Sequence, residues 1–515
     1  MTSPQEAPIE QIMQDICWDV MQPIAPKDTS IDPVKYEIGV HRVAAMLREG
    51  CHALVRTSGS TIVAEVGEYM FALYDAEGHA AYVTAGVLPH LTGTEGAIKF
   101  IMAMFGDGIC EEDQFIINDP YILGLHTPDV MVAKPVFYKE ELLCWVGSLT
   151  HSVDIGAKDP GGASDSTNLF QEGIRLPGLK IVSQGNRVEE VFRLIKRGVR
   201  NPELMELDIS SKIAGNNVVY GRLNELISKE GPEFIKDLLQ KMIQETEDRG
   251  KARVASIPDG VWRNRVYCEH NGIDWQLIWC DVVATKSGDT IHFDLSESSS
   301  QQPGPVNSPL AGSIGSMFSV LVSTIFWDLN WNKGVVTPLH ITIPQGSMFN
   351  PQYPAPCYAA PPTTSTLLAG NVTGIISEMS LAAGFKDTVC APWATSMYGV
   401  FMGGKTQFGK LEGTVTFDAN GSGTGATLQD DGDDTAAFIL APGSMMADVE
   451  SYEAKYPLLY LFRRRRENSG GYGRFQGGLG GEAAVMVHGT EQWHVGFRSI
   501  GHKVSCTAGI LGGYP

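Results

Sequence analysis

Glycine and proline interrupt this chain along its whole length. The sequence has 515 residues, of which 57 are Gly and 28 are Pro, and both residues favour turns and end helices. They stand between apolar stretches and do not gather into a linker, and the sequence contains no short repeat or clear domain boundary. This distribution of glycine and proline therefore predicts one large, intertwined α+β body built from short elements.

Two amphipathic helices are predicted at the start of the chain. The first, Pro8–Met21, repeats its apolar residues at helical spacing. The second begins after Asp32, which can cap it, and Pro33 suits its first position. Residues 1–31 are expected to form a helical extension before a main domain that spans 32–515. Each apolar face should pack on this chain or on a partner.

Periodicity and turn residues predict the further elements. A β-rich lobe is expected from about residue 385 to the C-terminus. Before it we expect strands at Tyr69–Asp75 and Glu141–Thr150, a helix at Thr94–Met104, a helical region from about 218 to 254 that breaks at Gly231-Pro232, a hairpin of Trp275–Thr285 with Thr290–Leu295, and apolar helices at Ser316–Trp327 and Leu367–Ala383.

The charge balance argues against nucleic acid as a partner. The chain has 39 basic and 59 acidic residues and a formal net charge of −20, so its field repels phosphate backbones. One basic run, 463–466, consists of four arginines. It is interpreted either as a solvated or inter-subunit strip of salt bridges or as an anion site.

Cysteine usage and the apolar stretches predict a cytoplasmic protein without a membrane span. The nine cysteines are scattered and form no C-x-x-C pair, which is typical of free thiols in a reducing compartment. The first eleven residues contain no apolar signal region. The most apolar stretch, Met317–Trp327, is about half as long as a membrane-spanning helix.

Metal-ligating residue types are densest between positions 118 and 162. His126 and Asp129 stand in H-T-P-D, His151 ends an apolar stretch, and Asp154 follows it. Imidazoles and carboxylates held by a stiff backbone can form a metal site. An H-x-x-D pair also occurs by chance, however. The spacing alone favours structural roles, in which His126 caps a turn and His151 is a core histidine.

Two other kinds of site find little support in the residues. The Gly-rich segment 469–481 lacks the Lys-Ser/Thr ending of a phosphate loop and favours turns and β-packing. The tracts CYAAPPTTS and RTSGS contain nucleophiles, but the chain has no G-x-S-x-G elbow.

An ordered series of motifs resembles the hydantoinase B/oxoprolinase family. That family includes subunits of N-methylhydantoinases, 5-oxoprolinases, caprolactamase, and acetone and acetophenone carboxylases. The segments that carry the resemblance are DPVKYEI (32–38), RTSGSTIVAEVGEYMFALYDAEG (56–78), LPHL (88–91), NDPYILGLHTPDVMVAKPVF (118–137), FQEGIRLPGLKI (170–181), PGPVNSP (303–309), NKGVVTPLHITIPQGSMFNPQYP (332–354), EAKYPL (453–458) and SGGYGRFQGGLG (469–480).

The resemblance implies a large hydantoinase-B-like body that carries a metal site. Carried over by motif, the ligands are His126, Asp129 and His151, with Glu68 where the family has an aspartate. The family's G-G-T-H is G-L-H here, with Gly124 two residues before the histidine. Mn²⁺, Zn²⁺ and Fe²⁺ all suit two imidazoles and two carboxylates, and the resemblance favours Mn²⁺ or Zn²⁺.

The resemblance also implies that the chain works with a partner. In the family, a hydantoinase-A-like subunit uses ATP to phosphorylate the oxygen of a small carbonyl substrate, and the metal-binding subunit acts on the activated species. Hydrolytic ring opening of a cyclic amide is the favoured reaction. Carboxylation of a ketone and a non-catalytic structural role are the alternatives.

Three further residues are candidates for the chemistry. Asp154 or His90 is expected to act as a base or to orient a ligand, or else to serve in the core or a turn. Arg56 is expected either to bind a phosphoryl or carboxylate group with its guanidinium fork or to form a structural ion pair.

Overall fold

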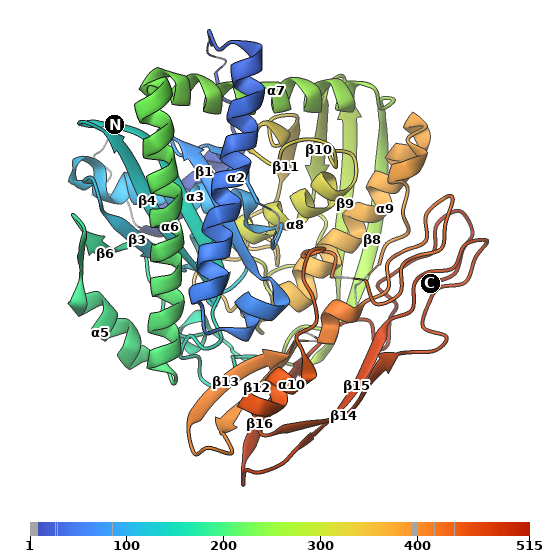
Figure 1. Ribbon diagram of the computed structural model, residues 1–515. Coiled ribbons are helices and arrows are strands. Elements are labelled where there is room, and N and C mark those ends of the chain that lie inside the picture. Colours follow the sequence, from blue (N-terminus) through green and yellow to red (C-terminus); the bar gives the residue numbers. More distant parts are fainter. Residues whose placement is uncertain are drawn as a thin grey trace.

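A seven-stranded antiparallel sheet organises the first half of the chain (Figure 1). The computed structural model describes residues 9–515 apart from 26, 28, 85, 394–398, 417 and 437. The strand order is β2-β1-β5-β4-β3-β6-β7. The strands are β1 (Tyr69–Asp75), β2 (Ala80–Val83), β3 (Gln114–Ile117), β4 (Asp129–Tyr138), β5 (Glu141–His151), β6 (Leu179–Ser183) and β7 (Asn186–Arg187).

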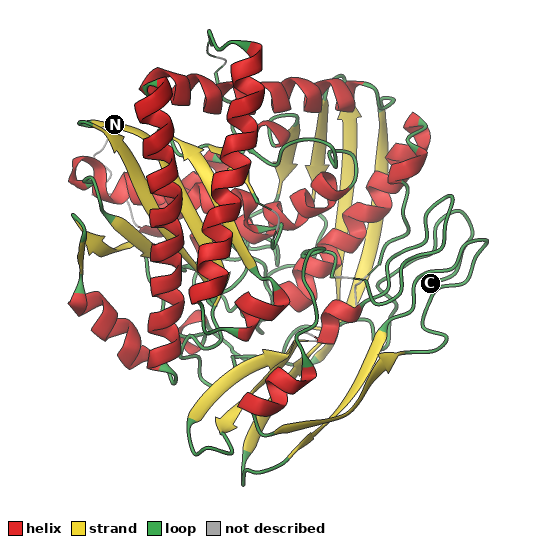
Figure 2. Ribbon diagram, in the orientation of Figure 1, coloured by secondary structure: helices red, strands yellow, loops and turns green. Residues whose placement is uncertain are grey.

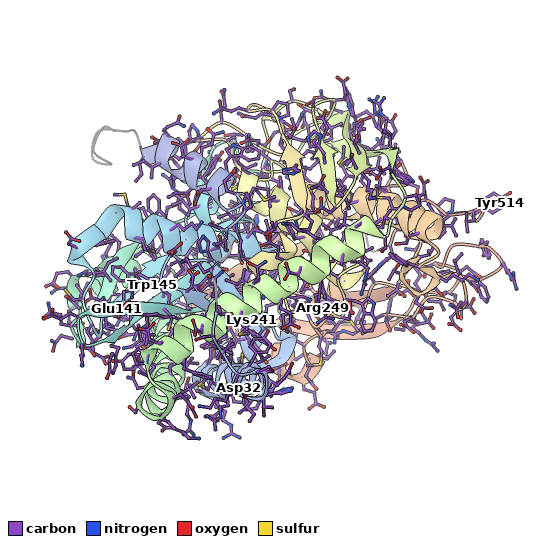
Figure 3. The ribbon with its side chains drawn as sticks, turned by 90° about the horizontal axis from the view of Figure 1, so that it is seen from above. Asp32, Glu141, Trp145, Lys241, Arg249 and Tyr514 are labelled. Carbon is purple, nitrogen blue, oxygen red and sulfur yellow. The ribbon has the colours of Figure 1, made fainter. Side chains whose placement is uncertain are left out.

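Two long helices cover one face of this sheet. α2 (Pro33–Thr57) packs on α6 (Pro202–Glu230), and the pair lies over β1, β4 and β5. The side chain of Asp32 caps α2 by accepting a hydrogen bond from the Lys35 N–H at 3.0 Å. The helix α7 (Pro232–Ala255) continues from α6 after Gly231, runs across the top of the molecule in Figure 1 and packs on α2 near Gly39. Figure 3 shows this helix from above, with Lys241 and Arg249 along it and Asp32 beside it.

The opposite face of the sheet packs on helices that it shares with a second sheet. α3 (His90–Phe105) and α8 (Leu310–Ser323) pack together, and α8 packs on α9 (Thr366–Ala383). α9 in turn lies against a four-stranded sheet of order β11-β10-β9-β8. Its strands are β8 (Gly260–His270), β9 (Trp275–Ser287), β10 (Thr290–Asp294) and β11 (Leu339–Thr342). One continuous apolar core joins the two sheets through these helices.

The C-terminal part is rich in strands and long loops, which Figure 2 shows in yellow and green. It contains a three-stranded sheet of order β13-β12-β16 and a two-stranded ribbon of β14 and β15. The elements are β12 (Gly399–Lys405), β13 (Leu411–Thr416), α10 (Val449–Lys455), β14 (Leu458–Arg465), β15 (Gly481–Val487) and β16 (Trp493–Arg498). Val400, Phe401 and Val415 pack in a core with Val130 and Val132 of β4. This part is therefore joined to the first sheet.

The N-terminal helix packs on this chain. α1 (Ile9–Asp19) lies against α3, α8 and the short helix α4 (Pro120–Leu123), and it buries Met13 and Cys17. The fully buried Lys333 hydrogen-bonds the carbonyl oxygen of Val20, just after the helix. Pro8, the first residue of the predicted helix, lies outside the described residues.

Most predicted elements are present, and three helices begin earlier than predicted, among them α8, which spans Leu310–Ser323 rather than Ser316–Trp327. β1 spans the predicted Tyr69–Asp75, and the predicted hairpin is formed by β9 and β10. α3 begins at His90 rather than at Thr94, and α6 begins at Pro202 rather than near residue 218. The first half of α6 buries Ser211, Gly215 and Asn216 against the sheet, so its buried face is too polar to show an apolar period.

The arginine run forms ion pairs within the chain. Arg463 pairs with Asp418 at 2.8 Å, Arg464 with Glu482 at 2.6 Å, and Arg465 with Asp434 at 2.6 Å. These contacts match the predicted strip of salt bridges. All nine cysteines are free thiols. Among the described residues, no helix is both long enough and apolar enough to cross a bilayer.

Candidate metal centre

Three adjacent strands bring the first candidate ligands to one end of the large sheet. Asp129 begins β4, His151 ends β5, and the two residues are register partners. Tyr69 of β1 pairs with Thr150 of β5, so Glu68, the residue before β1, continues that register towards His151. Side chains alternate along strands, and all three candidates therefore point to the face of the sheet that packs on α3.

His126 reaches the same place from the loop between α4 and β4. Asn118 holds this loop: its amide donates to the carbonyl oxygens of Thr127 at 2.8 Å and Ile174 at 3.0 Å. Gly124 turns the chain with φ +122°, a conformation that favours glycine. The segment G-L-H differs from the family's G-G-T-H, but it keeps the glycine that this turn requires.

His90 approaches from the first turn of α3, which lies close to the same loop. A Cβ at Gly93 would stand 1.7 Å from the carbonyl oxygen of Leu123, so only glycine allows this approach. His90 Nε2 then lies 3.5 Å from Asp129 Oδ1, and His126 Nε2 lies 3.7 Å from Asp129 Oδ2. The rings of His126 and His151 are 5.0 Å apart between centroids. Asp129 therefore stands between two imidazoles.

Burial sets the electrostatics of this group. It lowers the pKa of His126, and it lowers that of His151 to about 3. Burial would raise the pKa of Asp129, but His90 and His126 outweigh it and hold that pKa well below its usual value. Burial and the charge of Asp129 raise the pKa of Glu68 to about 8. Two neutral imidazoles and an ionised carboxylate result, and these are the forms that bind metals.

A small cavity of about 40 Å³ opens between these side chains. A volume of roughly 10–15 Å³ holds one water molecule, so the cavity has room for an ion and a few small ligands. Four polar residues and an apolar wall line it: Glu68, His126, Asp129, His151, Val87, Leu125, Pro361, Pro362, Phe401, Val415, Phe438 and Leu440.

The donors surround this cavity without forming a closed coordination shell. No three His, Cys, Asp or Glu side chains in the described parts of the chain make a finished metal-binding group. Donor atoms about 2.1 Å from one tetrahedral ion lie roughly 3.4 Å apart, and two of the candidate donors, His126 Nε2 and Asp129 Oδ2, are 3.7 Å apart. Within the described residues, Asp129 Oδ2 also has no hydrogen-bond donor. The residues present therefore fit a divalent metal ion.

Two of the predicted residues lie elsewhere. Asp154 is buried, accepts hydrogen bonds from the Arg200 N–H at 2.6 Å and from its guanidinium at 2.8 Å, and does not line the cavity. Arg56 lies exposed in the last turn of α2 and does not line it either. His90, the third candidate, is brought into contact with the ligand group.

Several residues of the site were not predicted from the sequence. The carbonyl oxygen of Tyr358 lies 2.9 Å from His126 Nδ1, and the apolar wall comes mostly from segments after residue 360, with Val87 and Leu125 from earlier segments. Glu172 contacts the backbone of Tyr358. Glu172 lies in FQEGIRLPGLKI, one of the segments that resemble the family. A single glutamate in that segment does not indicate a contact with Tyr358.

The chain matches characterised enzymes along nearly its whole length. It is 26% identical to the acetophenone carboxylase delta subunit of Aromatoleum aromaticum, over 98% of this chain and 75% of that subunit. It is 26% identical to the acetone carboxylase alpha subunit of Xanthobacter autotrophicus, over 94% of this chain and 65% of that subunit. It is 27% identical to caprolactamase subunit beta of Pseudomonas jessenii, over 88% of this chain and 77% of that subunit. These relatives are named as subunits, and the chain spans about two thirds to three quarters of their length.

Solved structures show the same fold. A nucleotide-free structure of acetone carboxylase superposes with a TM-score of 0.89 at 25% identity, covering 94% of this chain and 66% of that chain. An ATP-dependent caprolactamase from Pseudomonas jessenii superposes with a TM-score of 0.82 at 26% identity, covering 89% of this chain and 79% of that chain. The sequence profile of hydantoinase B/oxoprolinase matches residues 32–515. The chain belongs to the hydantoinase B/oxoprolinase family of enzyme subunits.

Proposed function

We propose that this chain is the metal-binding catalytic subunit of an ATP-dependent, cytoplasmic complex that acts on a phosphate-activated carbonyl group. One observation carries the proposal. Glu68 and the nearby residues His126, Asp129 and His151 come from three segments of the chain and converge on one buried cavity. Buried polar groups need partners, and a cation would supply one to Asp129 Oδ2, which has no hydrogen-bond donor among the described residues.

The proposed ligands are these four residues, and the proposed metal is Mn²⁺ or Zn²⁺. When bound, the ion would supply Lewis acidity that makes water a stronger nucleophile towards the phosphate-activated carbonyl carbon. His126 donates its Nδ1 proton to the carbonyl oxygen of Tyr358 at 2.9 Å, so its Nε2 lone pair remains for the metal. His90 contacts Asp129 from the opposite side of the carboxylate and orients it.

The apolar wall determines what can enter. Pro361, Phe401 and Phe438 also line the cavity, and an apolar lining lowers the local dielectric constant and strengthens electrostatic interactions inside the cavity. The cavity of about 40 Å³ admits only a reacting group, not a large substrate. A small carbonyl compound with an apolar body fits these properties.

The reaction that we propose is hydrolytic ring opening of a cyclic amide of the hydantoin or lactam type. The activated substrate would come from a hydantoinase-A-like ATPase subunit, because this chain has no phosphate loop of its own. The similarity to an ATP-dependent caprolactamase supports this reaction.

Carboxylation of a ketone is the second candidate. It is favoured by the similarity to the acetophenone carboxylase delta subunit, which extends over 98% of this chain. The same Lewis-acidic site could hold the enolate-like form of an activated ketone. The two reactions therefore differ in the co-substrate rather than in the ligands.

Elemental analysis of the purified protein tests the metal site. We expect about one transition metal ion per chain in the wild type and almost none in His126→Ala. His52→Ala replaces an exposed histidine on α2 and is the control. Retention of the metal and full turnover by a folded His126→Ala protein would contradict the proposal and favour a structural role for the subunit.

The complex with its ATPase partner distinguishes the two reactions. ATP turnover that depends on a lactam or hydantoin and yields the ring-opened acid supports hydrolysis. Turnover that needs both a ketone and bicarbonate shows carboxylation instead.

A further inference from the structure

Glu172 is a buried carboxylate next to the site but outside its cavity. It follows the short turn Leu169–Gln171, and none of its side chain is exposed. A carboxylate is rarely fully buried unless it is well partnered, so the contacts of Glu172 indicate what it holds in place.

The carboxylate of Glu172 holds the segment at Cys357-Tyr358. Its Oε1 accepts hydrogen bonds from the hydroxyl of Ser166 at 2.6 Å and from the N–H groups of Cys357 at 2.8 Å and Tyr358 at 3.0 Å. Its Oε2 lies 3.4 Å from the Cys357 thiol. Three good donors thus fix one oxygen, and two of them are consecutive backbone amides.

The same residue also holds the loop that carries His126. The carbonyl oxygen of Glu172 accepts a hydrogen bond from the Thr127 hydroxyl at 2.5 Å. The N–H of Tyr358 donates a hydrogen bond to the Glu172 side chain. The carbonyl oxygen of Tyr358 accepts a hydrogen bond from His126 Nδ1. The chain of contacts runs from Glu172 through the Tyr358 backbone to the imidazole.

We propose that Glu172 is a positioning residue that fixes the tautomer and direction of His126. By fixing the Tyr358 backbone, it aims a carbonyl oxygen at His126 Nδ1, which keeps the proton there and leaves Nε2 free on the side of Asp129. Residues that orient a ligand in this way usually change metal affinity 10–100-fold when replaced. The inference rests on the proposed metal site.

Replacement by an apolar residue of similar size tests this role. Glu172→Met fills the space but removes the acceptor, so the affinity for Zn²⁺, measured by chelator competition, should fall about 10–100-fold. The visible spectrum of the Co²⁺-substituted protein should change with it. Glu172→Gln keeps an oxygen that accepts the Tyr358 N–H, and its affinity should stay near that of the wild type.

Glu269 offers a matched control. It is also a buried glutamate that accepts backbone N–H groups, from His502 at 2.5 Å and Lys503 at 3.2 Å, and it does not line the cavity. Glu269→Met should lower thermal stability and leave both the Zn²⁺ affinity and the Co²⁺ spectrum unchanged.

The outcomes separate this inference from the metal site itself. A folded Glu172→Met protein with wild-type Zn²⁺ affinity overturns the positioning role. So does an equal loss of affinity in Glu269→Met. If Glu172→Met does not fold, Ser166→Ala decides: weaker Zn²⁺ binding supports the role, and unchanged binding refutes it. Retention of metal by His126→Ala instead refutes the proposed site, whatever the Glu172 variants do.

Discussion

Asp129 has a buried carboxylate oxygen whose desolvation is not offset by a hydrogen bond from any described residue. It is buried between two imidazoles, and Oδ2 has no hydrogen-bond donor among the described residues. A buried oxygen without a donor costs roughly 1–3 kcal/mol, and more when it is charged. Such a cost is tolerated where a ligand removes it. At the scale of single residues, the unsatisfied carboxylate is thus the strongest sign of function.

Lys212 is a second buried charge, and it lies on the other face of the sheet. Its ammonium donates to the hydroxyl of Thr150 at 2.7 Å, and burial lowers its pKa from 10.5 to about 8. Between about pH 8 and pH 10.5, Lys212 is mostly protonated in the unfolded chain and mostly deprotonated in the folded chain. The stability of the wild type should therefore rise with pH over this window, relative to Lys212→Met, by about 3 kcal/mol at most.

Chemical denaturation of both proteins at several pH values from 7 to 11 measures this difference. Comparing the two proteins cancels the titration of tyrosines and thiols. Parallel curves over the whole range would show that Lys212 titrates normally in the folded state.

Phe401 is expected to limit the size of the substrate. Phe401→Leu widens the apolar side of the cavity and should cost about 1–2 kcal/mol of stability. In steady-state kinetics, kcat/KM for a larger lactam ring should rise relative to that for a smaller one. Phe318→Leu makes the same change in α8, away from the cavity, and should leave the preference unaltered. An unchanged preference in Phe401→Leu would place the substrate elsewhere.

At the scale of elements, α1 is held by a small apolar face. Met13 is buried against the body, and Gln11 in the same helix is exposed. Met13→Asp should destabilise the protein by about 3 kcal/mol or more, because it buries an unpaired charge. Gln11→Asp introduces the same residue and should change stability by less than about 0.5 kcal/mol. Thermal unfolding measures both, and equal effects would show that α1 does not dock as described.

The elements that the sequence predicted well are those with a local cause. Asp32 and Pro33 specify the start of α2 by themselves, and the apolar run from Tyr69 specifies β1. The start of α6 was missed because the sheet accepts Ser211 and Asn216 at buried positions. These polar side chains can be buried because they find hydrogen-bond partners more than 60 residues away, such as the Val132 carbonyl that Asn216 contacts.

The site was predictable only in part, for the same reason. His126, Asp129 and His151 lie close together in sequence and share a motif. Tyr358, Pro361 and Pro362 stand in the tract CYAAPPTTS, which contains possible nucleophiles but gives no sign of contact with His126. They become part of the site only through the packing of the sheets, which no local pattern encodes.

At the scale of the whole molecule, the metal should couple the site to global stability. A ligand that binds only the native state stabilises it by about 3 kcal/mol when its concentration is roughly 100 times its Kd. Addition of a chelator should therefore lower the Tm of the wild type by several degrees. His126→Ala, scanned with and without chelator, should show no shift. Identical melting curves for the wild type under both conditions would argue against a bound metal.

The bond between His126 and Tyr358 has a consequence for synthesis of the chain. The two residues are 232 positions apart, and a ribosome adding about 5–20 residues per second needs roughly 10–50 s to cover that distance. During this time the nascent chain holds His126, Asp129 and His151 but not the carbonyl that orients the first of them. The growing polypeptide therefore cannot capture an ion in the finished geometry until most of it has left the ribosome. If the proposed metal binds, its loading would therefore be a late event that follows folding of the Tyr358 segment.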